Sequence, residues 1–191
     1  VYFDAEKGVM VVGLDDESDW EAGEVIVHVY NNTGATIENG TVVAYGGTTG
    51  ASGNITVVKA IADGSMPANY IVGVATQDIP NGSDGHVAYM ASVRHLDTSM
   101  WAADDILYVS QTVAGGYTNV LPTSGLTIPI AVVMRSHAET GVLLVNRGLM
   151  AHTDLSYEIS GEDIIINSST GRSVTLSPAT TAEPGLMSSA D

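Results

Sequence analysis

The sequence predicts an all-β protein in which short antiparallel strands form a compact β-barrel or sandwich, followed by a C-terminal β-hairpin and an extended linker. Short β-branched runs recur along the chain and are separated by turns rich in Gly, Asn, Asp and Ser. Helical periodicity is nearly absent, and only Thr98–Asp104 predicts a single capped turn. With 191 residues, of which 45% are hydrophobic and 15% charged, the chain can bury a core without disulfides.

The first predicted strand, Val25–Tyr30, ends at the turn Asn31–Gly34, because Asn and Gly both tolerate a positive φ. Asn81–Gly85 is predicted to be a hairpin loop. Further strands are predicted at residues 41–45, 55–61, 70–75, 86–93, 106–109, 128–134 and 141–146. The segments 72–88 and 131–144 share one plan: an apolar strand, a loop that ends in Gly and a returning apolar strand. Two such hairpins suit a barrel or a sandwich.

Composition divides the chain into four parts. Residues 1–24 are expected to be an acidic, extended N-terminal lead-in, and residues 25–150 the β-barrel or sandwich domain. Residues 151–177 are expected to be a small β-hairpin extension. Residues 178–191, with small side chains and the pair Pro184-Gly185, are expected to be a linker toward a following shaft segment.

The C-terminal hairpin is expected to pair residues 157–167 with residues 172–176 through the turn Ser168–Gly171. An isolated hairpin is only marginally stable in water. It must therefore dock on the main domain or on neighbouring copies of itself, which points to a homo-oligomer.

The formal net charge is −16, and it arises mainly because the chain has only six Lys and Arg. Nucleic acid is a poor partner for such a chain, because binding phosphates needs a basic footprint. An anionic membrane surface is disfavoured for the same reason, and the apolar runs are too short for membrane insertion. Excess acids give a solvated, self-repelling surface, with Ca²⁺ or a basic partner as the alternative.

No pattern predicts a metal site. The five histidines have neither the i, i+4 spacing nor the H-E-x-x-H motif of a zinc site; they are His28, His86, His95, His137 and His152. The acids from Asp15 to Glu24 invite comparison with a Ca²⁺ loop. That pattern fails, since Trp20 stands where the loop needs Gly and Ile26 where it needs Glu. We therefore expect no metal and no cofactor.

No pattern predicts catalysis either, so we expect that the protein is not an enzyme and has no catalytic residues. There is no G-x-S-x-G motif, and the Gly-rich stretch 46–53 lacks the Lys of a phosphate loop, so it is expected to be a mobile loop. Several acids have the sequence context of ordinary turns; they are Asp78, Asp84, Asp97, Asp104 and Asp105. The N-x-S/T matches at Asn31, Asn39, Asn54, Asn81 and Asn167 are explained by turn composition.

Five tyrosines lie on or beside predicted strands, and this predicts a packing role. They are Tyr30, Tyr45, Tyr70, Tyr89 and Tyr108. A surface that stacks on saccharides is the functional alternative.

Residues 30–147 resemble a domain that recurs in tailed-bacteriophage fibres and virion appendages. The resemblance begins at Asn31–Val43. It continues in the same order through Lys59-Ala60, Val72–Ile79, Gly82–Val87, Leu96–Thr98, Asp105–Ser110, Gly115–Thr118 and Ile130–Val133. Residues 179–191 resemble the linker that precedes shaft segments in phage fibres. One departure is Ala103-Asp104-Asp105, where similar sequences more often have Gly before the Asp.

The resemblance implies a structural virion protein, an anchoring or spacer module of a tail or head fibre that mounts a host-recognition tip. It implies a homotrimer, other tail or capsid proteins as partners, and a host glycan bound through a distal tip. A capsid decoration protein that stabilises the head is the first alternative. A carbohydrate-binding module is the second, and a glycan-cleaving depolymerase is the only enzymatic option.

Overall fold

A computed structural model describes residues 1–6, 8–13, 19–50, 53–123, 125–147, 155–168 and 173–178. The prediction of an all-β fold is confirmed, because the described part of the chain contains strands and one short 3₁₀ turn but no α-helix. Nor does any helix in these ranges have the length and apolar character needed to cross a membrane.

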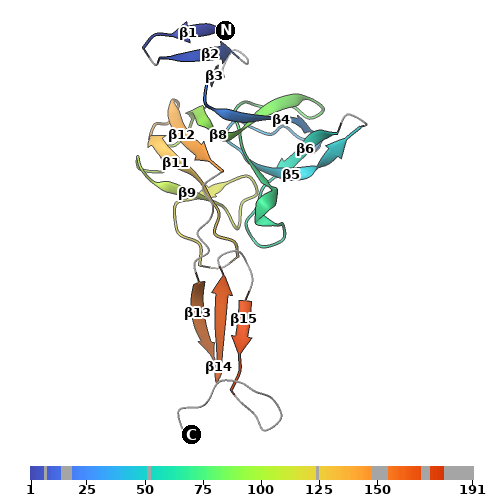
Figure 1. Ribbon diagram of the computed structural model, residues 1–191, viewed down its shortest axis with the longest axis vertical. Coiled ribbons are helices and arrows are strands. Elements are labelled where there is room, and N and C mark those ends of the chain that lie inside the picture. The colour runs from blue at the N-terminus through green and yellow to red at the C-terminus, as the bar shows by residue number, and fades with distance from the viewer. Residues whose placement is uncertain are drawn as a thin grey trace.

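The strands form three sheets. The N-terminal sheet consists of β1 (Tyr2–Asp4), β2 (Val9–Gly13) and β3 (Asp19–Glu21). The central sheet consists of β4 (Val25–Asn31), β5 (Val42–Thr49), β6 (Asn54–Lys59), β7 (Ile71–Ala75), β8 (Asp84–Leu96), β9 (Ile106–Val109), β10 (Tyr117–Thr118), β11 (Pro129–Arg135) and β12 (Gly141–Asn146). The C-terminal sheet consists of β13 (Leu155–Ser160), β14 (Asp163–Ser168) and β15 (Ser173–Leu176). Figure 1 shows the N-terminal and C-terminal sheets at opposite ends of the molecule.

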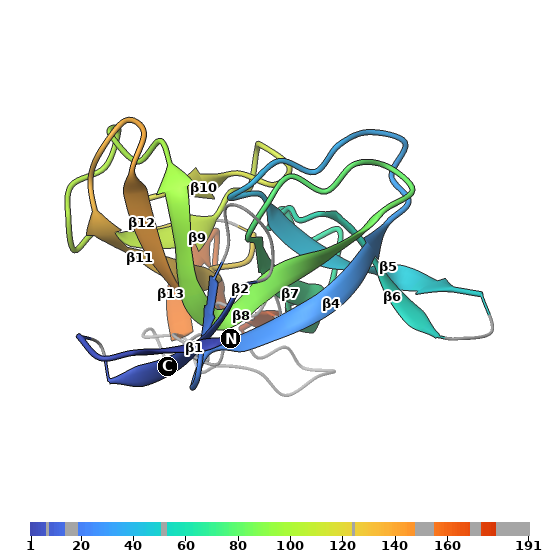
Figure 2. The same cartoon turned by 90° about the horizontal axis from the view of Figure 1, so that it is seen from above.

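Part of the central sheet closes into a five-stranded barrel in the order β8-β4-β6-β5-β7, because β7 pairs back onto β8. β8 is thirteen residues long, and it belongs to two structures at once. Its first half pairs with β4 and β7 in the barrel, and its second half pairs with β12 in the open part of the sheet. Figure 2 shows β8 running from the barrel into the neighbouring layer that contains β11 and β12.

Two buried clusters explain why the barrel strands are apolar on both faces. Inside the barrel, Val29 of β4, Val57 of β6 and Val87 of β8 pack together, all at most 1% exposed. On the outside, Ala88 of β8 belongs to a second cluster that reaches Leu143 of β12. Consecutive residues of β8 therefore enter different cores, as the two-residue period of a strand requires.

Closure of the barrel depends on one close approach. At Gly73 of β7, a Cβ atom would come within 1.9 Å of the backbone oxygen of Ala88 in β8. Any side chain at this position would push the two strands apart. The register Val74↔Ala88 and Ala75↔Val87, which closes the barrel, follows directly after Gly73.

The predicted strands of the central domain are all present, and both predicted hairpins form, since β7 pairs with β8 and β11 with β12. The prediction of a Gly-rich loop at 46–54 is wrong for most of its length. β5 runs through Gly46 and Gly47 to Thr49, and β6 resumes at Asn54. These glycines lie in a bulged hairpin, because the pairing register shifts between Tyr45 and Gly47.

Both terminal segments are more structured than expected. The N-terminal lead-in contains β1, β2 and β3 in place of extended chain. The C-terminal hairpin is a three-stranded sheet, because the predicted strand 157–167 is divided by a turn at Gly161, whose φ is 67°. The predicted turn at 168–171 and the linker after Pro178 lie almost entirely outside the described residues.

The departure at Ala103-Asp104-Asp105 has a local explanation. Asp104 has a φ of 72°, which is the left-handed region that Gly adopts without strain. Asp tolerates this conformation better than most residues. The turn is therefore kept, with Asp104 in a conformation that ordinarily favours Gly. The predicted capped turn from Thr98 contains no helix, only the bond from the Trp101 amide to the Thr98 carbonyl.

Candidate functional site

The C-terminal sheet has one face on which every described side chain is apolar. The pairing register places Tyr157, Ile166 and Val174 in one row across the sheet and Ile159, Ile164 and Leu176 in the next. Cross-strand partners lie on the same face of a sheet. The six side chains, called here the C-terminal apolar face, therefore point to the same side.

Three side chains on the edge strands of the C-terminal apolar face are exposed, while Ile164, Ile166 and Leu176 are partly buried. Tyr157 is 73% exposed, Ile159 is 69% exposed and Val174 is 59% exposed. Neither buried core cluster includes any of the six side chains. Figure 1 shows the sheet as an arm that extends away from the barrel.

The opposite face of this sheet is mainly polar. Apart from Ile165, it carries polar and acidic side chains, with Glu158 and Asp163 as its two charges. Apolar and polar residues thus alternate along these strands, as they do in a sheet that buries one face and leaves the other in water.

The N-terminal sheet, in contrast, is attached through its inner face to the second half of β8, in the open part of the central sheet. Val11 of β2 is 1% exposed. Beside it in the register, Glu21 of β3 accepts a hydrogen bond from Nη2 of Arg94 in β8, at 3.1 Å. The carboxylate of Glu24 accepts from the backbone amides of Ser92, at 2.8 Å, and Glu21, at 3.0 Å. These acids, expected to be a solvated lead-in, instead hold the sheet against β8.

The outer face of the N-terminal sheet is apolar. Phe3 pairs with Met10, and Val12 pairs with Trp20. Phe3 is 60% exposed and Met10 is 45% exposed, while Val12 and Trp20 are partly buried. The indole N–H of Trp20 donates to the carbonyl oxygen of Glu24 at 2.8 Å, so its polar atom is already satisfied. Phe3, Met10, Val12 and Trp20 are called here the N-terminal apolar face.

Two of the five histidines lie close together. His28 and His86 are directly opposite each other on β4 and β8, and their ring centroids are 5.8 Å apart. Nε2 of His28 lies 3.7 Å from Oδ1 of Asp84, and Nδ1 of His86 lies 3.2 Å from Oε1 of Gln77. Across the described ranges, no three His, Asp or Glu side chains converge to hold a metal ion.

The other histidines are separate from this pair. His95 lies in β8 with a φ of 59°. Nδ1 of His137 accepts from the backbone amides of Glu139 and Thr140, at 3.1 and 3.2 Å, and so stabilises the β11–β12 turn. His152 lies outside the described residues.

The loop acids stabilise turns, as expected from their sequence context. Asp97 accepts from the Ser99 hydroxyl at 2.6 Å and from its amide at 3.0 Å, and these bonds lower the pKa of Asp97 from its usual value. Asp78 accepts from the Asn39 amide, and Asp105 from the Ala102 amide and Asn119. Asp97 thus stabilises its own turn, whereas Asp78 and Asp105 also tie their loops to other segments of the chain. Part of the acidic stretch, residues 15–18, lies outside the described chain.

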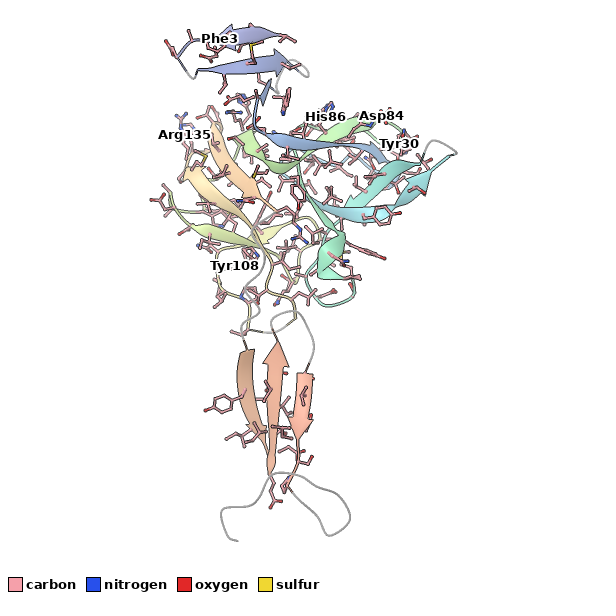
Figure 3. The ribbon with its side chains drawn as sticks, viewed as in Figure 1. Phe3, Tyr30, Asp84, His86, Tyr108 and Arg135 are labelled. Atoms are coloured by element: carbon pink, nitrogen blue, oxygen red, sulfur yellow. The ribbon has the colours of Figure 1, made fainter. Side chains whose placement is uncertain are left out.

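The tyrosines predicted from the strand pattern do not form one surface. Tyr45 and Tyr70 form an edge-to-face pair at 5.7 Å and are 38% and 43% exposed. Figure 3 places Tyr30 on the barrel and Tyr108 well apart from it on β9. Tyr89 is 39% exposed in β8. Of these five tyrosines, only Tyr45 and Tyr70 form a ring pair with each other in the described chain.

Asn31, the first of the N-x-S/T matches, is fully buried. Its amide nitrogen donates to the carbonyl oxygens of Ala35 and Ile79, and its oxygen accepts from the hydroxyl and the amide of Thr33. Asn39 donates to the Arg94 carbonyl at 3.0 Å, and Asn81 accepts from the Gly34 amide at 2.7 Å. Three of these asparagines thus hold loops in place. The other two lie in strands, Asn54 in β6 and Asn167 in β14.

Sequence reasoning missed a partly buried aromatic pair that packs against the core. Trp101 and Tyr117 meet edge to face at 5.6 Å, and the Tyr117 hydroxyl donates to the Gly40 carbonyl oxygen. Burial raises the pKa of Tyr117 well above its usual value. It also missed the two apolar faces, although the alternation of Leu155-Ser-Tyr-Glu-Ile-Ser160 carried the signal for one of them.

Comparison with solved structures finds similarity to a chain described as the head fiber gp8.5 N base of bacteriophage phi29. The TM-score is 0.40 and the sequence identity 15%, over 68% of this chain and 99% of that chain. No family model matches the chain, and no curated protein does.

Proposed function

We propose that this protein is a structural module of a bacteriophage virion, an anchoring or spacer element of a fibre, which self-associates as a homotrimer through the C-terminal apolar face. The resemblance of residues 30–147 to phage fibre domains supports the virion role. The observation that carries the assembly is the exposure of Tyr157, Ile159 and Val174 on one wholly apolar face of the sheet.

Physical chemistry favours a permanent partner on this face. A narrow sheet with one apolar face gains stability only when that face leaves water. The folded sheet needs a partner on its apolar face at all times. Another copy of the same chain meets this need, because it is present wherever the protein is made. The charges agree, since Glu158 and Asp163 lie on the other face, away from the contact. Copies of a chain with a net charge of −16 can therefore meet here without bringing like charges together.

The width of the sheet favours three copies. Strands lie about 4.8 Å apart and packed sheets about 10 Å apart. Three sheets of this width, set as the sides of a triangular prism, each lie about 4 Å from the axis, close to half the usual sheet spacing. Ile164 and Ile166 of the central strand would then meet at the axis, and the side chains of β13 and β15 would close the corners. Two such narrow sheets stacked face to face would leave both rims in water.

Two adjacent positions in β15 test the assembly. Val174→Glu places a carboxylate in the C-terminal apolar face, whereas Thr175→Glu adds the same charge on the opposite face. Light scattering of the unchanged chain at tens of micromolar is expected to give three times the chain mass of 19.8 kDa. Val174→Glu is expected to give the single-chain mass, and Thr175→Glu the trimer. A single-chain mass for the unchanged protein, or equal dissociation by both variants, would refute the trimer.

The virion role is tested separately. Antibodies raised against the chain are expected to label appendages of purified phage particles in electron micrographs. Labelling spread evenly over the head shell would instead support the decoration role, and particles without label would contradict any virion role.

A glycan-binding role has one specific observation in its favour, the exposed pair Tyr45–Tyr70. Exposed aromatic rings can stack on the apolar faces of sugars. Binding on a glycan array that Tyr45→Ala with Tyr70→Ala abolishes, and that Tyr89→Ala leaves unchanged, would support this role. A blank array for the unchanged chain would exclude it for the glycans tested.

A further inference from the structure

We propose that the outer face of the open part of the central sheet is a second contact between copies of this chain. The inference rests on the proposed trimer and deepens it, because it names the surface through which the bodies of neighbouring copies meet. The face is formed by β9, β11, β12 and the second half of β8. It is called here the central apolar face, and its members are Met90, Ile106, Val132, Met134 and Leu144.

Strand pairing puts these side chains on one side of the sheet. Ile106 and Leu144 both lie opposite Val132, and Leu144 also lies opposite Ser92 of β8. Met90 is two residues from Ser92, and Met134 is two residues from Val132, so both point the same way as this row. Met134 is 55% exposed, Ile106 is 50% exposed, and Met90 and Leu144 are each 41% exposed.

The central apolar face points away from the barrel. The residues that alternate with its members, Leu107, Val133 and Leu143, belong to the core cluster that also contains Ile71 and Val74 of β7. In Figure 1 and Figure 2, β9, β11 and β12 lie on one side of the molecule, beside the barrel. The C-terminal sheet extends from the body along the long axis (Figure 1). Copies that are joined through that sheet around a rotation axis point the same way and lie side by side, so the sides of their bodies come together.

The surface that a stable trimer needs favours this second contact. Specific, stable interfaces bury about 800 Å² on each partner, from roughly 20–30 residues. The C-terminal apolar face supplies six side chains, and in a trimer they are shared between two neighbours. The central apolar face spans four strands, against three in each terminal sheet. It therefore supplies apolar area that the C-terminal sheet lacks.

The charges favour another copy as the occupant. On its described strands, this face carries no Asp or Glu, and its charged side chains are Arg94 and Arg135. Arg94 is bonded to Glu21, whereas Arg135 is exposed at the rim. The chain has 22 Asp and Glu against six Lys and Arg, so a second copy is an acidic partner. A three-fold ring joins two different patches at each contact, and Arg135 of one copy then pairs with an acid of the next.

Methionine oxidation tests the contact without altering the face. Hydrogen peroxide converts exposed Met to the sulfoxide, and peptide mass spectrometry gives a rate for each position. At tens of micromolar, Met90 and Met134 of the unchanged chain are expected to oxidise at least about fivefold more slowly than in the dissociated Val174→Glu variant. Met10 is the matched control, because it is 45% exposed and lies on the N-terminal sheet. Its rate is expected to be the same in both proteins.

A charge placed in the face gives a second measurement. Leu144→Glu puts a carboxylate in the central apolar face, whereas Val113→Glu puts one at a 60% exposed position in the loop between β9 and β10. Light scattering over a range of concentrations follows dissociation of the trimer. Leu144→Glu is expected to raise the concentration of half-dissociation by about tenfold or more, and Val113→Glu by less than about threefold.

The outcomes separate this contact from the trimer itself. A trimer mass together with equal oxidation of Met90 and Met134 in the unchanged chain and in Val174→Glu overturns the second contact and leaves the trimer standing. Equal slowing at Met10 also overturns it, because the protection then has no specific place. A single-chain mass for the unchanged protein overturns both proposals. Should Leu144→Glu fail to fold, the oxidation rates of the unchanged face still decide.

Discussion

The N-terminal and C-terminal sheets have the same number of strands and one apolar face each, but they differ in what holds them. β1–β3 is held on β8 by the Glu21–Arg94 ion pair and by the bond from the Ser92 amide to Glu24. Neither sheet contributes a side chain to the two buried core clusters of the described chain, but Val11 of β2 is 1% exposed, whereas Tyr157 and Ile159 of β13 are 73% and 69% exposed. An attached sheet can keep a free face exposed until a partner arrives, whereas an unattached sheet needs its partner in order to fold. The comparison therefore separates a sheet that is bonded to β8 from a sheet that has no such support in the described chain.

The largest effect is expected from opening the central barrel, because β1–β3 rests on its strand β8 and β13–β15 does not. Gly73→Ala would place a Cβ atom 1.9 Å from the Ala88 oxygen, so we expect loss of barrel closure and destabilisation by about 4 kcal/mol or more. Hydrogen exchange is expected to show lost protection in β1–β3, which rests on β8, and retained protection in β13–β15 at concentrations that keep the oligomer. Equal loss in both terminal sheets would contradict the comparison.

A smaller effect is expected from removing only the ion pair between Arg94 and Glu21, which attaches β1–β3 to β8. Arg94→Met leaves the partly buried carboxylate of Glu21 without its ion pair and is expected to cost about 1 kcal/mol in local opening of β1–β3. Hydrogen exchange of the β2 amides checks this. Arg135→Met removes the same charge from an exposed position on β11 and serves as the matched control. If both variants leave β2 equally protected, the ion pair does not hold the sheet.

The smallest effect is expected at a site that touches neither sheet. The bonds from Ser99 lower the pKa of Asp97 from its usual value, so its carboxylate stabilises the fold above the unfolded pKa, and that stability is lost as pH falls through the folded pKa. Asp97→Asn is therefore expected to lower the midpoint of denaturation slightly at neutral pH and to match the unchanged chain in strong acid. A difference that grows as pH falls would reverse this sign. Protection of β1–β3 and of β13–β15 is expected to stay unchanged throughout.

The sequence predicted the strands better than their assembly. β-branched runs such as Val25–Tyr30 mark strands locally, because each residue type carries its own preference. Closure of β7 on β8 depends instead on the missing side chain of Gly73, which the sequence shows only as a glycine within a strand. β1–β3 was missed because its acids suggested solvated chain, whereas Glu21 and Glu24 find partners on β8, far away in sequence.

The candidate surfaces were less predictable than the fold. The alternation in 155–160 predicts an apolar face, but the turn at Gly161 decides which residues of 163–168 share it. The expectations of no catalytic residue, no metal and no cofactor remain predictions. The choice between head and tail, and the identity of a receptor, depend on partners that one chain does not encode.

The long strand β8 also determines how this protein carries a mechanical load. Val25, where the chain enters β4, lies opposite Met90 on one side of β8, and Asn146, where it leaves β12, lies opposite Met90 on the other. A pull between the two ends of the molecule would draw Val25 and Asn146 apart across β8 at the level of Met90. Both ladders end at this residue, so their hydrogen bonds would be loaded first at Met90 and would open one after another from there. The tension would cross the body at a single level of one strand and leave the closure of the barrel at Gly73 unstressed.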